Sequence, residues 1–154
     1  MKTIILSVNS SKKKGTAKTP VESARLLEGC GLQGDAHAGI DEIRQVSLLA
    51  FESIMKQNES LKISGNAGNL KPGDFGENIT TSGIDLLKLK IGDRLKFGDE
   101  TILEISKIGK ECHGRCAIYY KTGDCIMPRE GLFAKVLKGG VVSAGDKIEA
   151  VNNV

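Results

Sequence analysis

The sequence predicts a mainly β fold, a closed or partly closed β-barrel with two or three short helices. Three observations favour it. The 154 residues include 19 glycines without a repeat period and only 3 prolines, as many tight turns would require. The apolar segments are short and suit six to eight short strands. Strands and helices do not alternate as a Rossmann fold requires, and the glycine loops lack its phosphate-binding pattern.

The length favours a single domain that spans residues 1–154, and the 40% hydrophobic and 27% charged composition is typical of globular proteins. Thr3–Val8 is predicted to be the first strand rather than a signal peptide, because its apolar part is short and lysines follow it. Residues 9–19 are predicted to form a mobile loop. Its lysine run at 12–14 is a solvated segment or, alternatively, an anion-binding arm.

Four segments follow in the first half of the chain. Residues 20–27 fit a strand or a short helix, and residues 31–39 form a glycine-punctuated loop in which the backbone can turn sharply or approach a ligand. Residues 46–49 are predicted to be a short buried strand. Residues 50–57 are predicted to be helical, since apolar side chains recur at spacings of three and four.

The second half contains a clear hairpin signal at residues 91–105, with its turn at 98–100, after an irregular loop at 60–75. Residues 130–137 are predicted to form a helix, because an apolar stripe lies between a preceding proline and two following glycines. Residues 142–149 resemble the start of the hairpin. Both segments place Gly-Asp before a basic and an aliphatic residue, which suggests two similar turns into strands.

Charge and cysteine content exclude several classes of protein. The balance of 22 basic and 19 acidic residues is too mild to indicate a nucleic-acid partner. No apolar stretch approaches the roughly 20 residues that a membrane helix needs. Without an export signal, the four cysteines are expected to be reduced thiols in the cytoplasm rather than a disulfide framework.

The densest reactive segment is residues 109–116, which contain Cys112 and Cys116. Three basic side chains flank these thiols. Positive charge stabilises a thiolate, the form that attacks electrophiles and binds soft metals. A thiolate in an electropositive pocket is therefore the leading chemical hypothesis. The basic residues are Lys110, His113 and Arg115.

Other interpretations of these residues stay open. A structural zinc site would need three thiols and one imidazole, and a redox pair would need two thiols. Cys30 and Cys125 also fit small buried hydrophobes. The zinc ligands would be Cys112, Cys116, Cys125 and either His37 or His113, and the redox pair would be Cys112 with Cys116.

Polar residues in the glycine-rich loops also have two interpretations. His37 is either a site residue or an imidazole that only hydrogen-bonds Asp35. Glu77 and Asn78 are either site residues or turn formers. Glu130 favours a helix N-terminus, so its main role is predicted to be structural.

Several of these motifs, in this order along the chain, resemble the MOSC domain, the module named for the C-terminal part of eukaryotic molybdenum-cofactor sulfurase. Each motif alone is weakly specific, and their ordered combination is more specific. They are Lys18-Thr19-Pro20-Val21, Gly31 to Gly39 (GLQGDAHAG), Gly73 to Ile79 (GDFGENI), Ile91 to Leu95 (IGDRL) and Arg115-Cys116.

The resemblance implies a β-barrel of the pyruvate-kinase-insert type, of the short stand-alone bacterial kind, with a pocket for the molybdenum cofactor (molybdopterin). It implies that one cysteine carries sulfur or ligates molybdenum. Cys116 matches that position best as catalytic residue and metal ligand, and Cys112 is the second catalytic candidate. An anionic cofactor needs cationic side chains and backbone N–H groups. The candidate cofactor-binding residues, from the family motifs and from this chemistry, are Lys18, Gly34, Asp35, His37, Arg44, Glu77, Asn78 and Arg115.

No lysine lies in a sequence context that favours a Schiff base, so pyridoxal phosphate is not expected. Sulfur transfer would need a cysteine desulfurase as partner, and reductase activity would need an electron-transfer partner. The leading hypothesis is therefore a cytoplasmic cofactor-binding protein that acts in cofactor maturation or sulfur transfer. The alternatives are a molybdenum-dependent reductase of N-hydroxylated compounds and a non-catalytic small barrel with structural zinc or redox thiols. No nucleic acid and no membrane are expected as partners.

Overall fold

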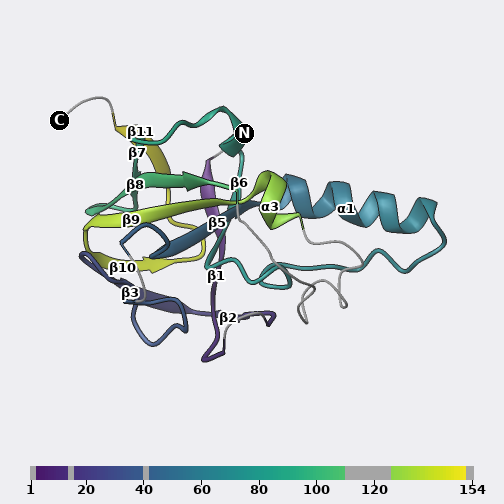
Figure 1. Ribbon diagram of the computed structural model, residues 1–154, viewed down its shortest axis with the longest axis horizontal. Helices are drawn as coiled ribbons and strands as arrows, with labels where there is room; N and C mark the ends of the chain where they lie inside the picture. Colours follow the sequence, from purple (N-terminus) through teal and green to yellow (C-terminus); the bar gives the residue numbers. More distant parts are fainter. Residues whose placement is uncertain (1–2, 14–15, 40–41, 110–125, 152–154) are drawn as a thin grey trace.

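The strands of the computed structural model form two sheets, and one long helix extends away from them (Figure 1). The structure describes residues 3–13, 16–39, 42–109 and 126–151. The large sheet has the order β11-β7-β8-β9-β5-β6-β1-β2, and the small sheet has the order β10-β3-β4. The protein is therefore mainly β, as predicted.

The large sheet consists of β1 (Ile4–Ser10), β2 (Thr19–Val21), β5 (Val46–Ala50), β6 (Ile79–Ser82), β7 (Arg94–Phe97), β8 (Thr101–Ile108), β9 (Leu132–Lys138) and β11 (Ile148–Val151). The small sheet consists of β3 (Ser23–Leu27), β4 (Gly31–Leu32) and β10 (Gly140–Ser143). The helical segments of the described residues are α1 (Phe51–Ile63), the 3-10 turn η1 (Leu86–Lys88) and α3 (Met127–Glu130).

The core divides into two clusters of buried side chains. The larger cluster draws on strands of both sheets and includes Leu48, Phe97 and Leu103, none of which is exposed. The smaller cluster lies at the base of α1, where Ile54 packs with Phe133 and with Met127 of α3. The two helices meet here, because the Ser53 hydroxyl donates to Glu130 Oε1 at 2.8 Å (Figure 1).

The predicted closure into a barrel is not confirmed. The large sheet is open in its strand pairing, with β11 and β2 at its two ends. The start of β1 does approach the turn before β11. An isolated bridge joins Ile4 to Lys147, and the Ile5 N–H donates to the Asp146 carbonyl at 2.8 Å. This contact joins β1 to the turn before β11, although the two strands are not neighbours in the sheet. It is a single isolated bridge and not a continuous pairing of strands.

Most of the predicted elements are confirmed. The first strand and the short buried strand are β1 and β5, and residues 20–27 hold β2 and β3. The hairpin is β7 and β8, in register at Leu95 and Leu103. The first predicted helix is α1, which continues to Ile63, so the first residues of the predicted loop at 60–75 are helical.

The second predicted helix, residues 130–137, is wrong, because all but its first two residues lie in strand β9. Four of the first five residues of β9 are buried, since the strand pairs with β5 on one side and β8 on the other. A short continuous apolar run of this kind fits a buried strand and a helix equally well by periodicity. The two glycines that follow it lead from β9 into β10.

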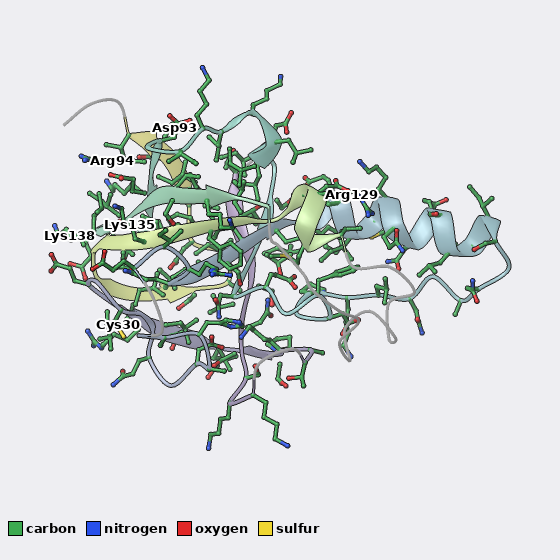
Figure 2. All side chains as sticks on the ribbon, in the orientation of Figure 1. Cys30, Asp93, Arg94, Arg129, Lys135 and Lys138 are labelled. Atoms are coloured by element: carbon green, nitrogen blue, oxygen red, sulfur yellow. The ribbon has the colours of Figure 1, made fainter. Side chains whose placement is uncertain are left out.

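A cross-strand charge ladder stabilises the outer surface of β7, β8 and β9. Glu104 lies opposite Arg94 on one side and Lys135 on the other, and its carboxylate contacts them at 3.1 and 3.7 Å. Figure 2 shows Arg94 and Lys135 on the same side of the molecule. In the described part of the chain, no helix has the length and apolar character needed to cross a membrane.

The two predicted Gly-Asp turns have the same structure. In each, the aspartate carboxylate accepts a hydrogen bond of 2.8 Å from the backbone N–H three residues earlier, Lys90 for Asp93 and Ser143 for Asp146. The glycine before each aspartate has a positive φ of 95 to 98°, a conformation that glycine adopts without strain. The turns lead into β7 and β11, which pair with each other.

Candidate functional site

A buried ion pair lies where β1, β2 and the glycine-rich loop after β4 meet. Lys18 Nζ lies 2.8 Å from Asp35 Oδ1, and each side chain is 1% exposed. Lys18 immediately precedes β2, and Asp35 closes the turn after β4. Burial of two charges is tolerated only when their remaining hydrogen-bonding capacity is satisfied.

Asp35 meets that requirement through several donors. Its Oδ1 accepts from the backbone N–H of Ser11 at 3.0 Å, and its Oδ2 accepts from the backbone N–H of His37 at 3.0 Å. Burial alone would raise the pKa of Asp35. The contacts with His37, Lys18 and Ser11 outweigh it and hold the pKa well below its usual range. Asp35 is therefore a carboxylate.

The same Gly-Asp sequence serves two purposes in this molecule. The turn that ends at Asp35 has the backbone hydrogen bond of the other turns, from the Asp35 N–H to the Leu32 carbonyl at 3.0 Å. In the turns at Asp93 and Asp146, the carboxylate closes its own turn. The Asp35 carboxylate instead binds Lys18 and Ser11, far away in the sequence. It holds three segments together.

His37 lies beside this ion pair and is partly exposed. Its Nδ1 atom is 3.1 Å from Lys18 Nζ, within hydrogen-bond distance, and 3.6 Å from Asp35 Oδ2, beyond that distance. The side chain is 22% exposed. The predicted contact between His37 and Asp35 is present as a hydrogen bond from the His37 backbone N–H. The ring lies beside both Lys18 and Asp35.

Glu77 is a second buried carboxyl group, in a different environment. It is fully buried, and its Oε2 accepts from the Gly73 N–H at 3.0 Å and from the Thr80 hydroxyl at 2.6 Å. Its Oε1 has no hydrogen-bond partner among the described residues. Burial raises the pKa of Glu77 to about 7, because these hydrogen bonds only partly offset the loss of solvation.

Asn78 is fully buried and joins three strands. Its Oδ1 accepts from the Ser47 N–H of β5 at 3.0 Å, and its Nδ2 donates to the Asn9 carbonyl of β1 at 3.3 Å. Asn9 in turn donates through Nδ2 to the Glu77 carbonyl at 3.1 Å. These contacts place Glu77 and Asn78 inside the scaffold that positions the ion pair, away from solvent.

Gly73 connects the two buried carboxyl groups. Its N–H donates to Glu77, and its carbonyl accepts the Lys18 N–H at 2.7 Å. A Cβ atom at this position would lie 2.2 Å from the Lys18 carbonyl oxygen, and φ is +91°. Only glycine allows the two chains to approach so closely with this backbone conformation.

The structure thus brings together five of the eight predicted cofactor-binding residues. Lys18, Asp35 and His37 contact one another directly, while Glu77 and Asn78 join them through Gly73 and Asn9. The other described candidates, Gly34 and Arg44, are exposed, and neither takes part in the hydrogen bonds that build this cluster. The remaining candidates, Arg115, Cys112 and Cys116, lie outside the described residues, as do His113 and Cys125.

Two residues of the cluster were not predicted. Asn9 and Ser11 lie in the segment expected to be a mobile loop, yet Asn9 belongs to β1 and is fully buried. The Ser11 hydroxyl accepts from Lys18 Nζ at 3.3 Å. The sequence signal that could have identified them is their position in a polar run directly after an apolar strand. An asparagine at the end of a buried strand needs partners, so it points to other polar groups nearby.

Within the described residues, no group of three or more His, Cys, Asp or Glu side chains could hold a metal ion. Cys30 is the one cysteine that the structure describes, and it is a free, partly buried thiol. It lies in the turn between β3 and β4 (Figure 2). The zinc site predicted as an alternative rests on cysteines outside the described residues.

A comparison with protein-family models supports the resemblance that the sequence motifs indicated. The sequence model of the MOSC domain matches residues 33–149, which is most of the chain. The chain belongs to the MOSC domain family. That family is associated with functions related to the molybdenum cofactor. No curated protein matches the chain.

Solved structures share this MOSC fold. The YuaD protein from Bacillus subtilis has a TM-score of 0.76 and 21% identity, over 97% of this chain and 96% of YuaD. YiiM from Geobacillus stearothermophilus has a TM-score of 0.73 and 22% identity, over 97% of this chain and 75% of YiiM. YiiM from Escherichia coli has a TM-score of 0.71 and 22% identity, over 100% and 71%. At this level of identity, the similarity shows the fold alone.

Among the described residues of this cluster, the His37 imidazole is the group that an anionic ligand such as molybdopterin could contact. Lys18 is not available to an anionic ligand, because its three N–H groups meet Asp35, Ser11 and His37. The partly exposed group is the His37 imidazole, beside an ion pair that carries no net charge. An imidazole N–H suits a phosphate oxygen of the cofactor. A soft ligand to the metal would have to come from the thiols outside the described residues.

Proposed function

We propose that this MOSC protein binds the molybdenum cofactor or a precursor in the cytoplasm, with residues 1–154 acting as a single domain, and handles sulfur or ligates molybdenum through Cys116. The bound group would supply a thiophilic metal centre. Arg115 would add positive charge beside the thiolate, and Cys112 is the second candidate for the reactive thiol. A full MOSC barrel, closed beyond the strand pairs described above, is part of the proposal.

The convergence of the family motifs carries this proposal. Lys18, Asp35, His37, Glu77 and Asn78 come from three separate motifs, and one hydrogen-bonded network joins them. The network buries an ion pair and a lone carboxyl group, although buried ionisable groups are unfavourable unless something else requires them. A protein that needed only a stable fold would be better served by apolar side chains here. We infer that these residues support a site.

Each motif residue has a distinct role in the proposal. Asp35 and Lys18 hold the glycine-rich loop against β1 and β2, and His37 is the residue of this cluster that reaches the ligand. Glu77 and Asn78 hold the loop before β6 against β1 and β5. Gly34 and Arg44, which are exposed, would contribute backbone N–H and positive charge at the periphery of the site.

Metal and pterin content test the proposal. The protein would be purified without oxygen from a host that makes the molybdenum cofactor, beside Cys116→Ser, Cys112→Ser and Cys30→Ser. We expect stoichiometric molybdenum and pterin in the wild type and a loss of molybdenum in Cys116→Ser. Cys30→Ser is the matched control, because this thiol lies in the β3–β4 turn and is expected to leave cofactor content unchanged.

Three outcomes would contradict all or part of the proposal. If the wild type contains neither molybdenum nor pterin, the proposed cofactor binding is wrong. Loss of molybdenum in Cys112→Ser but not in Cys116→Ser would move the reactive thiol to Cys112. One zinc ion per chain, with unfolding in the presence of a chelator, would support the structural zinc alternative instead.

The role of the bound cofactor needs a second experiment. For sulfur transfer, a cysteine desulfurase partner should load Cys116 with labile sulfur that a reductant releases. For the reductase alternative, the loaded protein should reduce an N-hydroxylated base when an electron-transfer partner is present. Labile sulfur on Cys116 without reductase activity supports maturation or transfer, and the converse supports the reductase.

A further inference from the structure

The contact between Lys18 and His37 determines which nitrogen of the imidazole carries a proton. Lys18 Nζ lies 3.1 Å from His37 Nδ1. An ammonium group has three donors and no acceptor, so a hydrogen bond between these atoms requires a lone pair on Nδ1. The imidazole is then neutral, with its single proton on Nε2.

The other contacts of Lys18 are compatible with this arrangement. Its Nζ also lies 2.8 and 3.1 Å from the two carboxylate oxygens of Asp35 and 3.3 Å from the Ser11 hydroxyl, so one N–H that Asp35 shares between its oxygens and one that Ser11 accepts leave the third for His37 Nδ1. The Ser11 hydroxyl proton is already donated to the Lys13 carbonyl at 2.8 Å. His37 Nδ1 could carry a proton only by donating to Asp35 Oδ2, and that distance is 3.6 Å.

The opposite edge of the ring is available to a ligand. Among the described residues, no hydrogen bond involves His37 Nε2, and this atom is not among the buried polar atoms that lack a partner. The side chain is 22% exposed, whereas Lys18 and Asp35 are 1% exposed. The charged pair is therefore sealed inside, and the imidazole is the part of the cluster that can contact a ligand.

We propose that Lys18 is a positioning residue that fixes His37 as an Nε2–H donor, and that this N–H binds an anionic oxygen of the ligand. The second half rests on the proposed cofactor function, in which the acceptor is a phosphate oxygen of molybdopterin or an oxygen of free molybdate. The first half concerns the protein alone.

This assignment separates His37 from the metal. A histidine that ligates a metal usually donates its other ring N–H to a carboxylate or carbonyl, which frees the ligating nitrogen. His37 has the reverse arrangement, because its second nitrogen accepts a hydrogen bond from a cation. Ligation through Nε2 would require loss of the proton from that atom. The role of His37 is thus to donate a hydrogen bond, and the zinc alternative would have to use His113 instead.

Nitrogen NMR of the metal-free protein tests the tautomer. The chain has two histidines, so His113→Gln leaves His37 as the single source of imidazole signals. In folded protein at neutral pH, we expect Nδ1 to be fully unprotonated and Nε2 protonated. Urea-unfolded protein provides the reference mixture of tautomers. A protonated Nδ1 in the folded protein, or a mixture equal to the unfolded one, would overturn the proposal.

Lys18→Met tests whether the lysine causes this tautomer. Without the ammonium group, the unpaired Asp35 carboxylate is the nearest acceptor for Nδ1, so the proton should move to Nδ1 and leave Nε2 bare. The double variant Lys18→Met/Asp35→Asn removes both charges and keeps the test valid if the single variant unfolds. It should show a measurable population protonated at Nδ1. An unchanged, exclusive Nε2–H tautomer in the folded variants would mean that Lys18 does not set it.

Two oxyanions test the ligand half. Inorganic phosphate and molybdate, each added in excess to metal-free protein, should shift the Nε2 resonance if they accept its hydrogen bond. A response to phosphate alone supports the pterin phosphate as acceptor, and a response to molybdate alone supports the metal oxyanion. Lys18→Met should lose the Nε2–H donor. The affinity for whichever oxyanion shifts the resonance should then fall by about 10- to 100-fold. No shift with either oxyanion would overturn this half.

The outcomes separate this inference from the proposed function. If the protein contains molybdenum and pterin but His37 is protonated at Nδ1, the proposed function is supported and the proposed role of Lys18 is contradicted. If the protein contains no cofactor but His37 has the Nε2–H tautomer, the positioning role of Lys18 is supported and the proposed function is contradicted.

Discussion

Asp35 and Glu77 are both buried carboxyl groups next to a Gly-rich turn, yet their surroundings differ in one respect. Asp35 has a cation, Lys18, at 2.8 Å, and two backbone N–H groups at 3.0 Å. Glu77 receives one backbone N–H and one hydroxyl, and no cation contacts it among the described residues. The pKa of Asp35 is held well below its usual range, while burial raises the pKa of Glu77 to about 7.

The difference shows that burial alone does not decide the charge of a carboxyl group in this molecule. Both groups are desolvated, and desolvation is the largest influence on each pKa. At Asp35, the contacts with His37, Lys18 and Ser11 together reverse its effect on the pKa. Backbone and hydroxyl donors without a cation only reduce it at Glu77. The two sites therefore respond to pH in opposite directions.

Removal of the cation should have the largest effect. In Lys18→Met, the Asp35 carboxylate stays buried without its partner, so we expect a loss of roughly 3–5 kcal/mol in the free energy of unfolding. Urea denaturation followed by circular dichroism measures it. The control is Lys18→Met/Asp35→Asn, which leaves no buried charge and should regain most of that loss. A double variant no more stable than the single one would show that Lys18 contributes by packing rather than by pairing.

Glu77 should produce the second largest effect, as a pH dependence of stability. Its pKa is about 7 in the folded protein and 4.5 in the unfolded chain. The folded state therefore keeps this proton longer, and the stability present below pH 4.5 is lost as the pH rises through 7. The expected loss is roughly 2–4 kcal/mol between pH 4.5 and 8.

Glu77→Gln supplies the control for that prediction. Glutamine cannot ionise, so its stability should vary much less between pH 4.5 and 8. Asp35 contributes the opposite trend at lower pH. Its stabilisation is present above its unfolded pKa of 3.8 and is lost as the pH falls below that value. Together the two groups place maximal stability near pH 4.5. Parallel pH curves for wild type and Glu77→Gln would show that Glu77 is not the group responsible.

The link between the two carboxyl groups through Gly73 should give a smaller effect, once the cost of backbone strain is subtracted with a control variant. Gly73→Ala forces a Cβ to within 2.2 Å of the Lys18 carbonyl at a φ of +91°. Gly92→Ala is a matched control, because its φ is +98° but nothing lies within 4 Å of the new Cβ. The control should lose about 1–2 kcal/mol through backbone strain alone. Gly73→Ala should lose about 1–3 kcal/mol more through overpacking. Equal losses would mean that the loop at Gly73 shifts freely and does not couple the two sites.

How far the sequence predicted this site depends on the kind of signal. The residues Asp35, His37, Glu77 and Asn78 were recognisable because they occur in glycine-punctuated motifs. Their division into an ion pair and a lone acid was not predictable. The distinction depends on whether Lys18, 17 residues from Asp35, reaches a given carboxylate, and that is a property of the tertiary structure.

The fold shows the same division between local and long-range information. The hairpin at β7 and β8 was predicted because its turn and its alternation are local features. The apolar run at β9 was assigned to a helix because its burial on both sides comes from β5 and β8, which are distant in sequence. Local spacing cannot distinguish a central strand from a helix when both faces are buried.

The smallest effect should come from an ion pair at the surface. Lys147 Nζ lies 2.7 Å from Glu149 Oε1, a shorter distance than that between Lys18 and Asp35, but both side chains are largely exposed at 72% and 45%. Hydrogen bonding and charge raise the pKa of Lys147 and lower that of Glu149. Solvent and salt screen such pairs, so Lys147→Met should leave the free energy of unfolding almost unchanged.

The measurement is the same urea denaturation, repeated at low and high salt beside Lys18→Met. Both variants remove one lysine from a carboxylate pair of similar length, so their difference measures the contribution of burial and of the hydrogen bonds that Lys18 also makes to Ser11 and His37. The small effect of Lys147→Met should vanish at high salt, whereas the loss in Lys18→Met should persist, since buried pairs are screened much less. If the two variants were equally destabilised, the short distance rather than the burial would determine the contribution of a pair, and the contrast between Asp35 and Glu77 would need another explanation.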